Sequence, residues 1–234
     1  MSSEISIARR GLFGQKVARY ERWDEMPQRD FSAFCAVLMR PYFSDEGREA
    51  MAEFLDEVQE SPVIVMKRLK VGRKTYHGPL SKFRFVRFGE LIAADSSLDA
   101  YAATGNEDFL YKFVASLYRP KGRLEGEDVR EEYNDALTDK YAREIRRKSD
   151  KDDVVAIMVN YSAVMRWITS RYPLLFPRGS GEDARHGEKG RSYLKMARAL
   201  ASGKTDADMQ EVYRSYVSNV FDALNDQIRQ DRKR

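Results

Sequence analysis

An apolar stretch near the middle of the chain constrains the fold most. Residues 152–171 contain the run VVAIMVNYSAVMRWI, whose apolar side chains cover most faces of a helix rather than a single stripe. Such a helix is stable in water only when other elements surround it. Asp150 or Asp152 suits its N-cap, because a carboxylate there accepts a hydrogen bond from a backbone amide. The segment predicts a central helix inside a helical bundle.

Helical periodicity recurs on both sides of this segment. Residues 5–23 show a loose amphipathic pattern interrupted by Gly11 and Gly14, which predicts a short helix or an arm. The chain lacks a regular alternation of strands and helices, which argues against a Rossmann or barrel enzyme. Apolar residues spaced three and four apart predict further helices over 28–40, 45–59, 88–95, 97–104, 107–119, 127–147, 190–202 and 206–230.

Two segments depart from this helical pattern. Residues 62–88, PVIVMKRLKVGRKTYHGPLSKFRFVRF, are rich in β-branched residues and are punctuated by glycine and proline, which predicts a β-hairpin insertion. Residues 173–190 are rich in glycine and proline and predict a flexible loop. We therefore expect a mainly α fold: one domain over residues 1–234, a bundle of about eight to ten helices with a small β-hairpin insertion near 62–88.

Composition sets limits on the class of protein. Of the 234 residues, 42% are apolar and 12% aromatic, which is enough for a large core, and 33% are charged, above the usual level of about 25%. The net charge of +4 permits contact with nucleic acid without requiring it. No stretch of about 18 apolar residues and no signal-peptide pattern is present, so we expect a cytoplasmic protein without membrane contact.

The residue types that usually carry catalysis are sparse. Cys35 lies in an apolar helical run, which favours a buried structural thiol over a nucleophile paired with His77 or His186. A zinc site needs about four ligands, more than these residues supply. Gly203-Lys204-Thr205 resembles the end of a P-loop, but Arg198 occupies the position of the required first glycine. We predict no enzyme and no cofactor; an enzyme with a carboxylate–magnesium site stays open as an alternative.

The basic insertion is the most informative polar feature. Between Ser61 and Gly89 the chain has eight cations and no carboxylate, with aromatic residues interleaved. Cations placed among aromatics suit nucleic acid; the alternatives are a hairpin that meets an acidic protein and a solvated hairpin whose aromatics pack on the body. The candidate contact residues are Lys67, Arg68, Lys70, Arg73, Lys74, Tyr76, Lys82, Phe83, Arg84, Arg87, an exposed Tyr118, and Arg119 as a rim contact or helix-end stabiliser.

Two segments seventy-nine residues apart match at five of eight positions. Residues 34–41 read FCAVLMRP and residues 113–120 read FVASLYRP. In both, Phe and Leu lie four apart on one helix face, Arg stands where the helix dipole favours a cation, and Pro ends the helix. The sequences after each proline do not align. Convergence on a stable helix end is the favoured explanation, and internal duplication stays open.

One resemblance to a known class of proteins covers about a third of the chain. Residues 83–122 contain an F-G-x-x-I turn, a small helix, and a helix that ends in A-x-L-Y-R-P; an apolar helix follows at 154–176. This arrangement resembles bacteriophage tail-assembly and virion-associated helical proteins, although the basic hairpin is not part of that pattern. The resemblance implies a non-enzymatic role in building a phage tail, neck or virion.

Under that resemblance, the partners are other phage structural proteins or further copies of this chain, which could form a homo-oligomer. The protein would lie in the host cytoplasm during assembly and in the virion. The alternative function is a nucleic-acid-binding module that uses the basic aromatic hairpin at 62–88.

Overall fold

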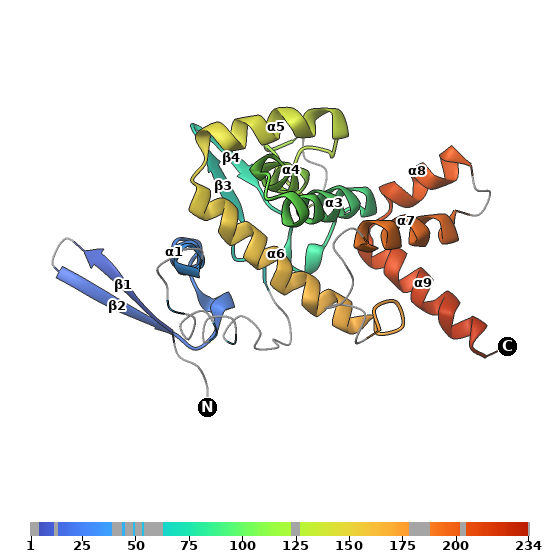
Figure 1. Ribbon diagram of the computed structural model, residues 1–234, viewed down its shortest axis with the longest axis horizontal. Helices are drawn as coiled ribbons and strands as arrows, with labels where there is room; N and C mark the ends of the chain where they lie inside the picture. The colour runs from blue at the N-terminus through green and yellow to red at the C-terminus, as the bar shows by residue number, and fades with distance from the viewer. Residues whose placement is uncertain are drawn as a thin grey trace.

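The computed structural model describes residues 5–11, 14–38, 44, 49, 53, 63–122, 127–177, 188–201 and 205–233. Over these residues the chain has eight α-helices and two small antiparallel sheets of two strands each (Figure 1). The mainly α fold class with a small hairpin is therefore confirmed. None of the described helices is long and apolar enough to cross a membrane.

The elements follow one another along the chain with short connections. The strands are β1 (Ile5–Gly11), β2 (Gly14–Tyr20), β3 (Arg68–Val71) and β4 (Lys74–His77). The α-helices are α1 (Gln28–Leu38), α3 (Phe88–Thr104), α4 (Glu107–Leu117), α5 (Asp135–Lys148), α6 (Lys151–Arg171), α7 (Glu188–Leu200), α8 (Asp206–Arg214) and α9 (Val217–Asp231).

Helix α6 is the central helix that the sequence predicts. It crosses the middle of the molecule diagonally in Figure 1 and contacts both α1 and α4. The Asp150 side chain caps it by accepting a hydrogen bond from the Asp152 amide at 3.0 Å. Asn160, only 1% exposed, accepts hydrogen bonds from the amides of Val65 (2.8 Å) and Met66 (3.1 Å). This one amide therefore fixes the chain that leads into β3 against the core helix.

The N-terminal segment is a β-hairpin, so the predicted helix over 5–23 is wrong. Strands β1 and β2 pair in register from Ile5↔Tyr20 to Gly11↔Gly14. The partly buried Ile5 and Ile7 alternate with an exposed Ser6, which is the period of a strand rather than of a helix. In Figure 1 the hairpin lies beside α1 and extends away from the helices, so it has the form of an arm.

Helix α3 is continuous where the sequence predicts two helices, 88–95 and 97–104. Aspartate and serine weaken a helix mainly when their side chains bond to the nearby backbone. Asp95 instead accepts a hydrogen bond from the Tyr161 hydroxyl of α6, so it does not interrupt the helix. The helix ends at Gly105, whose φ of +67° is the left-handed conformation typical of a C-cap glycine.

Two predicted helices have different boundaries because of tertiary hydrogen bonds. The helix expected over 127–147 starts only at Asp135, since residues 127–134 run along the preceding segment through the bridge Lys121↔Arg130. The helix expected over 206–230 is broken between α8 and α9. There Ser215 O accepts from the Phe88 amide at 2.8 Å, and the Val217 amide donates to Val86 O at 3.0 Å.

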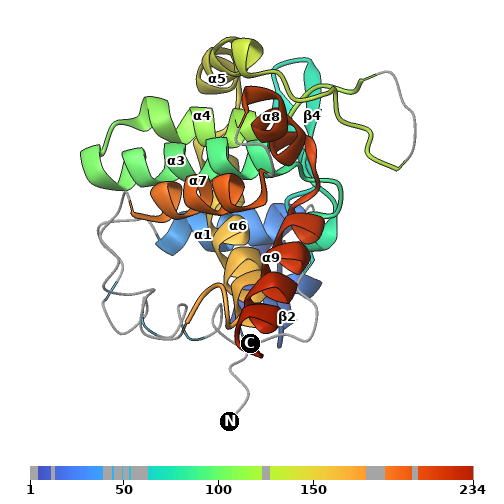
Figure 2. The same ribbon diagram turned by 90° about the vertical axis from the view of Figure 1, so that its right-hand side faces the viewer.

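The C-terminal helices close the bundle around α3. Figure 2 shows α7 alongside α3, and these helices contact each other. Phe221 of α9 lies at the centre of an aromatic cluster with Phe88, Tyr193 and Phe176. Thr205 caps α8 through a capping box with Asp208, as its position in the sequence predicts.

Two predictions fall wholly or partly outside the described residues. The helix over 45–59 lies outside them, apart from isolated residues. Of the predicted loop over 173–190, residues 173–175 form a turn and 188–190 belong to α7, so the described loop ends earlier than expected. Residues 178–187 lie outside the described part of the chain.

Candidate anion-binding surface

The insertion at 62–88 contains the predicted hairpin, with strands limited to residues 68–71 and 74–77. Leu69 and Val71 are buried while Arg68 and Lys70 are exposed, so β3 alternates between the core and solvent. Gly72 begins the two-residue turn with a φ of +61°, a conformation that glycine adopts without strain. The pattern leaves the cations of β3 on the outer face of the hairpin.

The hairpin is held at both ends by helices that come later in the chain. At its turn, the Gly72 amide donates to Lys148 O of α5 at 3.0 Å. Glu144 of α5 accepts from the Tyr76 hydroxyl at 2.8 Å and pairs with Lys74 at 3.1 Å. At its base, His77 exchanges two backbone hydrogen bonds with Arg119. The hairpin is therefore a fixed part of the helical body.

The aromatic residues of the insertion pack on that body. Tyr76 and Phe88 are fully buried, and Phe83 is buried in a stack with Tyr161 of α6, at 5.2 Å between ring centroids. Phe85 is half-buried against Tyr216. The candidate contact residues Tyr76 and Phe83 thus offer no open ring face to a nucleic-acid base. This agrees with the interpretation in which the aromatics pack on the helices.

Tyr118 and Arg119 are buried, so an exposed aromatic and a rim contact are wrong for these two residues. Tyr118 is 2% exposed, and its hydroxyl donates to Met66 O. Arg119 is also 2% exposed; it donates to Ser116 O in the last turn of α4. The helix-end role expected for Arg119 is confirmed. Both residues face inward because they lie between the hairpin and the bundle.

Arg119 belongs to a buried ionic cluster that the sequence does not reveal. Glu90 of α3, 2% exposed, pairs with Arg119 and with Arg130, each at 3.1 Å. Arg130 also pairs with Asp128 at 2.8 Å. These charges come from segments up to forty residues apart, and each has the opposite charge that burial requires. No spacing in the sequence marks Glu90 or Arg130 as partners.

Four of the eight cations of the insertion are engaged by the body. Lys74 pairs with Glu144, and Lys82 lies over the Trp167 ring at 5.7 Å. Two more form ion pairs with the segment before α5: Arg84 with Glu127 (2.9 Å) and Arg87 with Glu132 (3.1 Å). The four that remain are exposed and form no ion pair with any described residue: Lys67, Arg68, Lys70 and Arg73.

Helix α5 places a second group of cations next to the hairpin turn, as its left end in Figure 1 shows. A concavity of 440 Å³ along this helix is lined by Lys140, Arg143, Glu144, Arg146 and Arg147. Helix α4 neutralises only the near side, where Asp108 pairs with Arg146 and Lys112 pairs with Asp139. The sequence prediction missed this contribution of α5, because the helix is far from the insertion along the chain.

We call the combined surface the basic ridge. It consists of Lys67, Arg68, Lys70, Arg73, Lys74, Lys140, Arg143, Arg146, Arg147 and Lys148. Residues 67–77 and 140–148 together carry these ten cations and a single carboxylate, that of Glu144. Because the whole chain has a net charge of only +4, the remainder of the chain is net acidic. The basic character of the protein is therefore concentrated here.

Titratable groups beside the ridge respond to its charge. Partial burial and the nearby cations Arg68 and Lys121 lower the pKa of His77. The hydrogen bond from Tyr76 and the ammonium group of Lys74 hold the pKa of Glu144 below its ordinary value of 4.5. Both shifts indicate a positive potential around the hairpin, and such a potential attracts anions.

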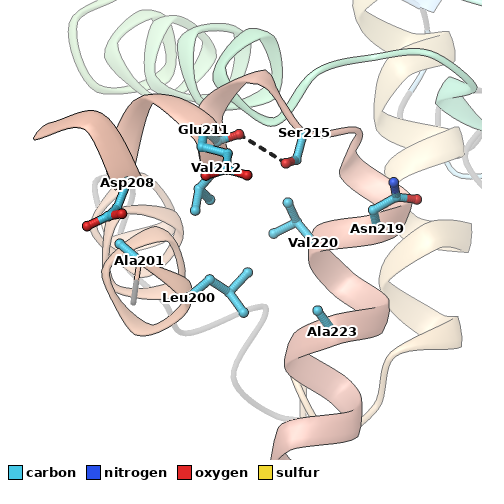
Figure 3. A pocket seen from close by; sticks show the side chains of 9 residues that line it. All are labelled: Leu200, Ala201, Asp208, Glu211, Val212, Ser215, Asn219, Val220 and Ala223. Carbon is cyan, nitrogen blue, oxygen red and sulfur yellow. Dashed lines mark hydrogen bonds between the residues drawn. The ribbon is translucent and has the colours of Figure 1, made fainter. Parts of the chain in front are cut away.

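A second concavity lies between the three C-terminal helices (Figure 3). It has a volume of 280 Å³ and combines apolar walls with the carboxylates Asp208 and Glu211. Figure 3 shows Glu211 O accepting a hydrogen bond from the Ser215 hydroxyl, so this backbone oxygen is already used in α8. The lining residues are Leu200, Ala201, Asp208, Glu211, Val212, Ser215, Asn219, Val220 and Ala223.

The other chemical candidates have structural roles where the structure describes them. Cys35 is buried in α1, and burial raises the pKa of its thiol, so it is not poised as a thiolate nucleophile. Arg198 lies within α7 and Thr205 caps α8, while Gly203 and Lys204 lie outside the described residues. Among the described residues, no group of three or more His, Cys, Asp or Glu side chains has an arrangement suited to a metal ion.

Comparison of this chain with protein-family models, with curated proteins and with solved structures finds no match in any of the three.

Proposed function

We propose that this chain is a non-enzymatic structural or assembly protein of a bacteriophage particle, which acts by binding partners through the basic ridge. The observation that carries the proposal is the ridge itself: cations held on a fixed hairpin and a fixed helix, most of them with no ion pair among the described residues. Exposed like charges repel one another, so a surface of this kind is stabilised when an anionic partner covers it.

The resemblance to phage tail-assembly and virion-associated proteins supplies the setting. Its two segments, 83–122 and 154–176, contain α3, α4 and α6, which form the centre of the bundle. The ridge is built on this centre, since the hairpin bonds to the end of α4 and α5 packs against α4. Under this proposal the protein lies in the host cytoplasm during assembly and in the finished virion.

The N-terminal hairpin supports the protein–protein contacts that assembly needs. Within the described residues its sheet has two strands, so one edge of each strand has no ladder partner. Val17 of β2 is 59% exposed, the largest exposure of any large apolar side chain in the described part of the chain. An open strand edge with an exposed apolar residue suits the addition of a strand from a second chain.

Retention on immobilised heparin tests the role of the ridge, because heparin is a polyanion without bases. We expect the wild-type protein to bind at low salt and to elute as the salt concentration rises. A triple variant K70Q/R73Q/R147Q should elute at clearly lower salt. The matched control K195Q/R198Q/R232Q removes the same charge from exposed positions on and next to the C-terminal helices. Equal elution of the two variants would contradict the proposal.

A further inference from the structure

The basic ridge presents more positive charge than the protein itself neutralises. Eight of its cations form no ion pair with any described residue: Lys67, Arg68, Lys70, Arg73, Lys140, Arg143, Arg147 and Lys148. Glu144 is the one carboxylate in the two segments, and it already accepts from Tyr76 and pairs with Lys74. A partner for this surface must therefore bring several negative charges at close spacing.

The ridge has the composition of a phosphate-binding surface rather than of a protein interface. The centres of protein interfaces are depleted in lysine and enriched in aromatic and apolar side chains. In the described part of the chain, Val17 and Tyr216 are the large apolar side chains that are clearly exposed, and neither belongs to the ridge. Lysine and arginine without an apolar centre are typical of contacts to a nucleic-acid backbone.

The ridge also lacks the stacking surfaces that single strands need. Proteins that bind single-stranded nucleic acid combine cations with open aromatic rings on which bases stack. The aromatic residues nearest the ridge, Tyr76 and Tyr141, are 0% and 7% exposed and pack edge-to-face at 5.6 Å between centroids. A duplex needs no such rings, because its bases are paired inside and its phosphates face outward.

The arrangement of the cations fits an extended row of phosphates. Lys140, Arg143 and Arg147 lie about one turn apart on one side of α5, over a length of about 10 Å. The row continues through Lys148 and the hairpin turn to Arg68 and Lys70 on the outer face of β3. A duplex carries one charge per about 1.7 Å of its axis, so several cations can contact phosphates at once.

From these observations we propose that the basic ridge binds the phosphate backbone of double-stranded nucleic acid without reading its sequence. The inference rests on the proposed function, since it names the partner of the same surface. It gives the α5 cations an equal part with the hairpin, and it assigns the aromatic residues of the insertion to the core.

Fluorescence anisotropy with a labelled 20-base-pair DNA duplex of arbitrary sequence tests the inference. We expect binding at low salt, with the logarithm of affinity falling linearly with the logarithm of salt concentration. Four phosphate contacts would give a slope of about −3.6. K70Q/R73Q/R147Q should lower the affinity about tenfold or more and reduce the slope, whereas K195Q/R198Q/R232Q should have less than about a twofold effect. A second duplex of unrelated sequence should bind equally well.

Two competitor probes separate the inference from the proposed function. The single strand of the same length and polyglutamate of equal charge should each displace the duplex less well than unlabelled duplex does. Ridge-dependent binding that polyglutamate matches or exceeds would overturn the duplex inference and leave the proposed function standing. Binding that K70Q/R73Q/R147Q leaves unchanged, or no binding of any polyanion, would overturn both.

His77 provides a local readout in the same experiment. It pairs with Arg68 across the hairpin, and the chain has only one other histidine, His186. In an H186Q background, a proton NMR titration follows the His77 imidazole alone. A phosphate bound near Arg68 should raise the lowered pKa of His77, because it offsets the positive charge beside the ring. A duplex that binds without moving this pKa would place the contact away from the hairpin and contradict the inference.

Discussion

At the scale of single residues, a few buried polar side chains join segments that are distant in the sequence. Asn160 connects the central helix to the chain before β3, and Glu90 connects α3 to two arginines beyond α4. A buried polar group costs free energy when its partner is lost, because it can no longer bond to water. Substitutions at these residues should therefore destabilise the fold more than their size suggests.

The substitution N160A tests the first of these contacts. It leaves the buried amides of Val65 and Met66 without an acceptor, so we expect a loss of about 2–4 kcal/mol in the free energy of unfolding. Chemical denaturation followed by circular dichroism measures the loss. The control S162A lies two residues along the same helix and is exposed, so its effect should stay below about 0.5 kcal/mol. Equal effects of the two variants would contradict the role of Asn160.

Glu90→Gln tests the buried ionic cluster. The change removes the charge that Arg119 and Arg130 share, and we expect a loss of about 3–5 kcal/mol in the free energy of unfolding. E127Q removes one partner of the exposed ion pair with Arg84 and should cost less than about 1 kcal/mol. Thermal and denaturant unfolding of both variants should agree on this order. A loss for E90Q as small as that for E127Q would mean that the arginines find other partners.

At the scale of elements, the contact between the β3–β4 hairpin and α5 should respond to acid. The pKa of Glu144 is lowered in the folded protein, so its contribution to stability is fully present above the ordinary value of 4.5. That contribution is lost as the pH falls below about 4.5 and through the folded pKa. Measured free energies of unfolding between pH 3 and pH 7 should show a slope in this range that is smaller in E144Q. The control E132Q, whose side chain is 75% exposed, should keep the wild-type slope.

The elements that the sequence predicts correctly are those whose pattern is local. Helices α1, α4 and α6 have regular apolar spacing, and β3–β4 has a two-residue turn with glycine, so each begins within a few residues of its expected position. The late start of α5 and the break between α8 and α9 depend on hydrogen bonds to residues 86–88 and to residues 120–122, which no local pattern records. The α5 half of the ridge was missed for the same reason.

At the scale of the whole molecule, charge and exposed apolar groups are separated. The ridge lies at the hairpin turn and along α5, whereas the N-terminal hairpin extends from the other side of α6 beside α1 (Figure 1). One surface can therefore bind an anion while the other contacts a second chain. This separation is what an assembly protein with two kinds of partner requires.

Light-scattering mass tests the contact through the N-terminal hairpin. We expect the wild-type protein to show a mass above the 27.1 kDa of one chain at micromolar concentration. V17D places a charge on the exposed side chain of β2 and should shift the mass toward that of one chain, because a buried unpaired charge is costly. The control Y216S changes the other clearly exposed large side chain of the described residues and should leave the mass unchanged. A mass of one chain for the wild type at every concentration would contradict self-association.

The joining of β3–β4 to α5 means that the ridge exists only in the native chain. Its two halves are about seventy residues apart, and a peptide of residues 62–88 would contain the hairpin cations without the α5 cations or the packing of Leu69 and Tyr76. A polyanion that recognises the full ridge thus binds the native state in preference to the denatured ensemble. By mass action it raises the melting temperature, and salt that releases the ligand removes this gain. Folding and partner binding are in this way thermodynamically linked.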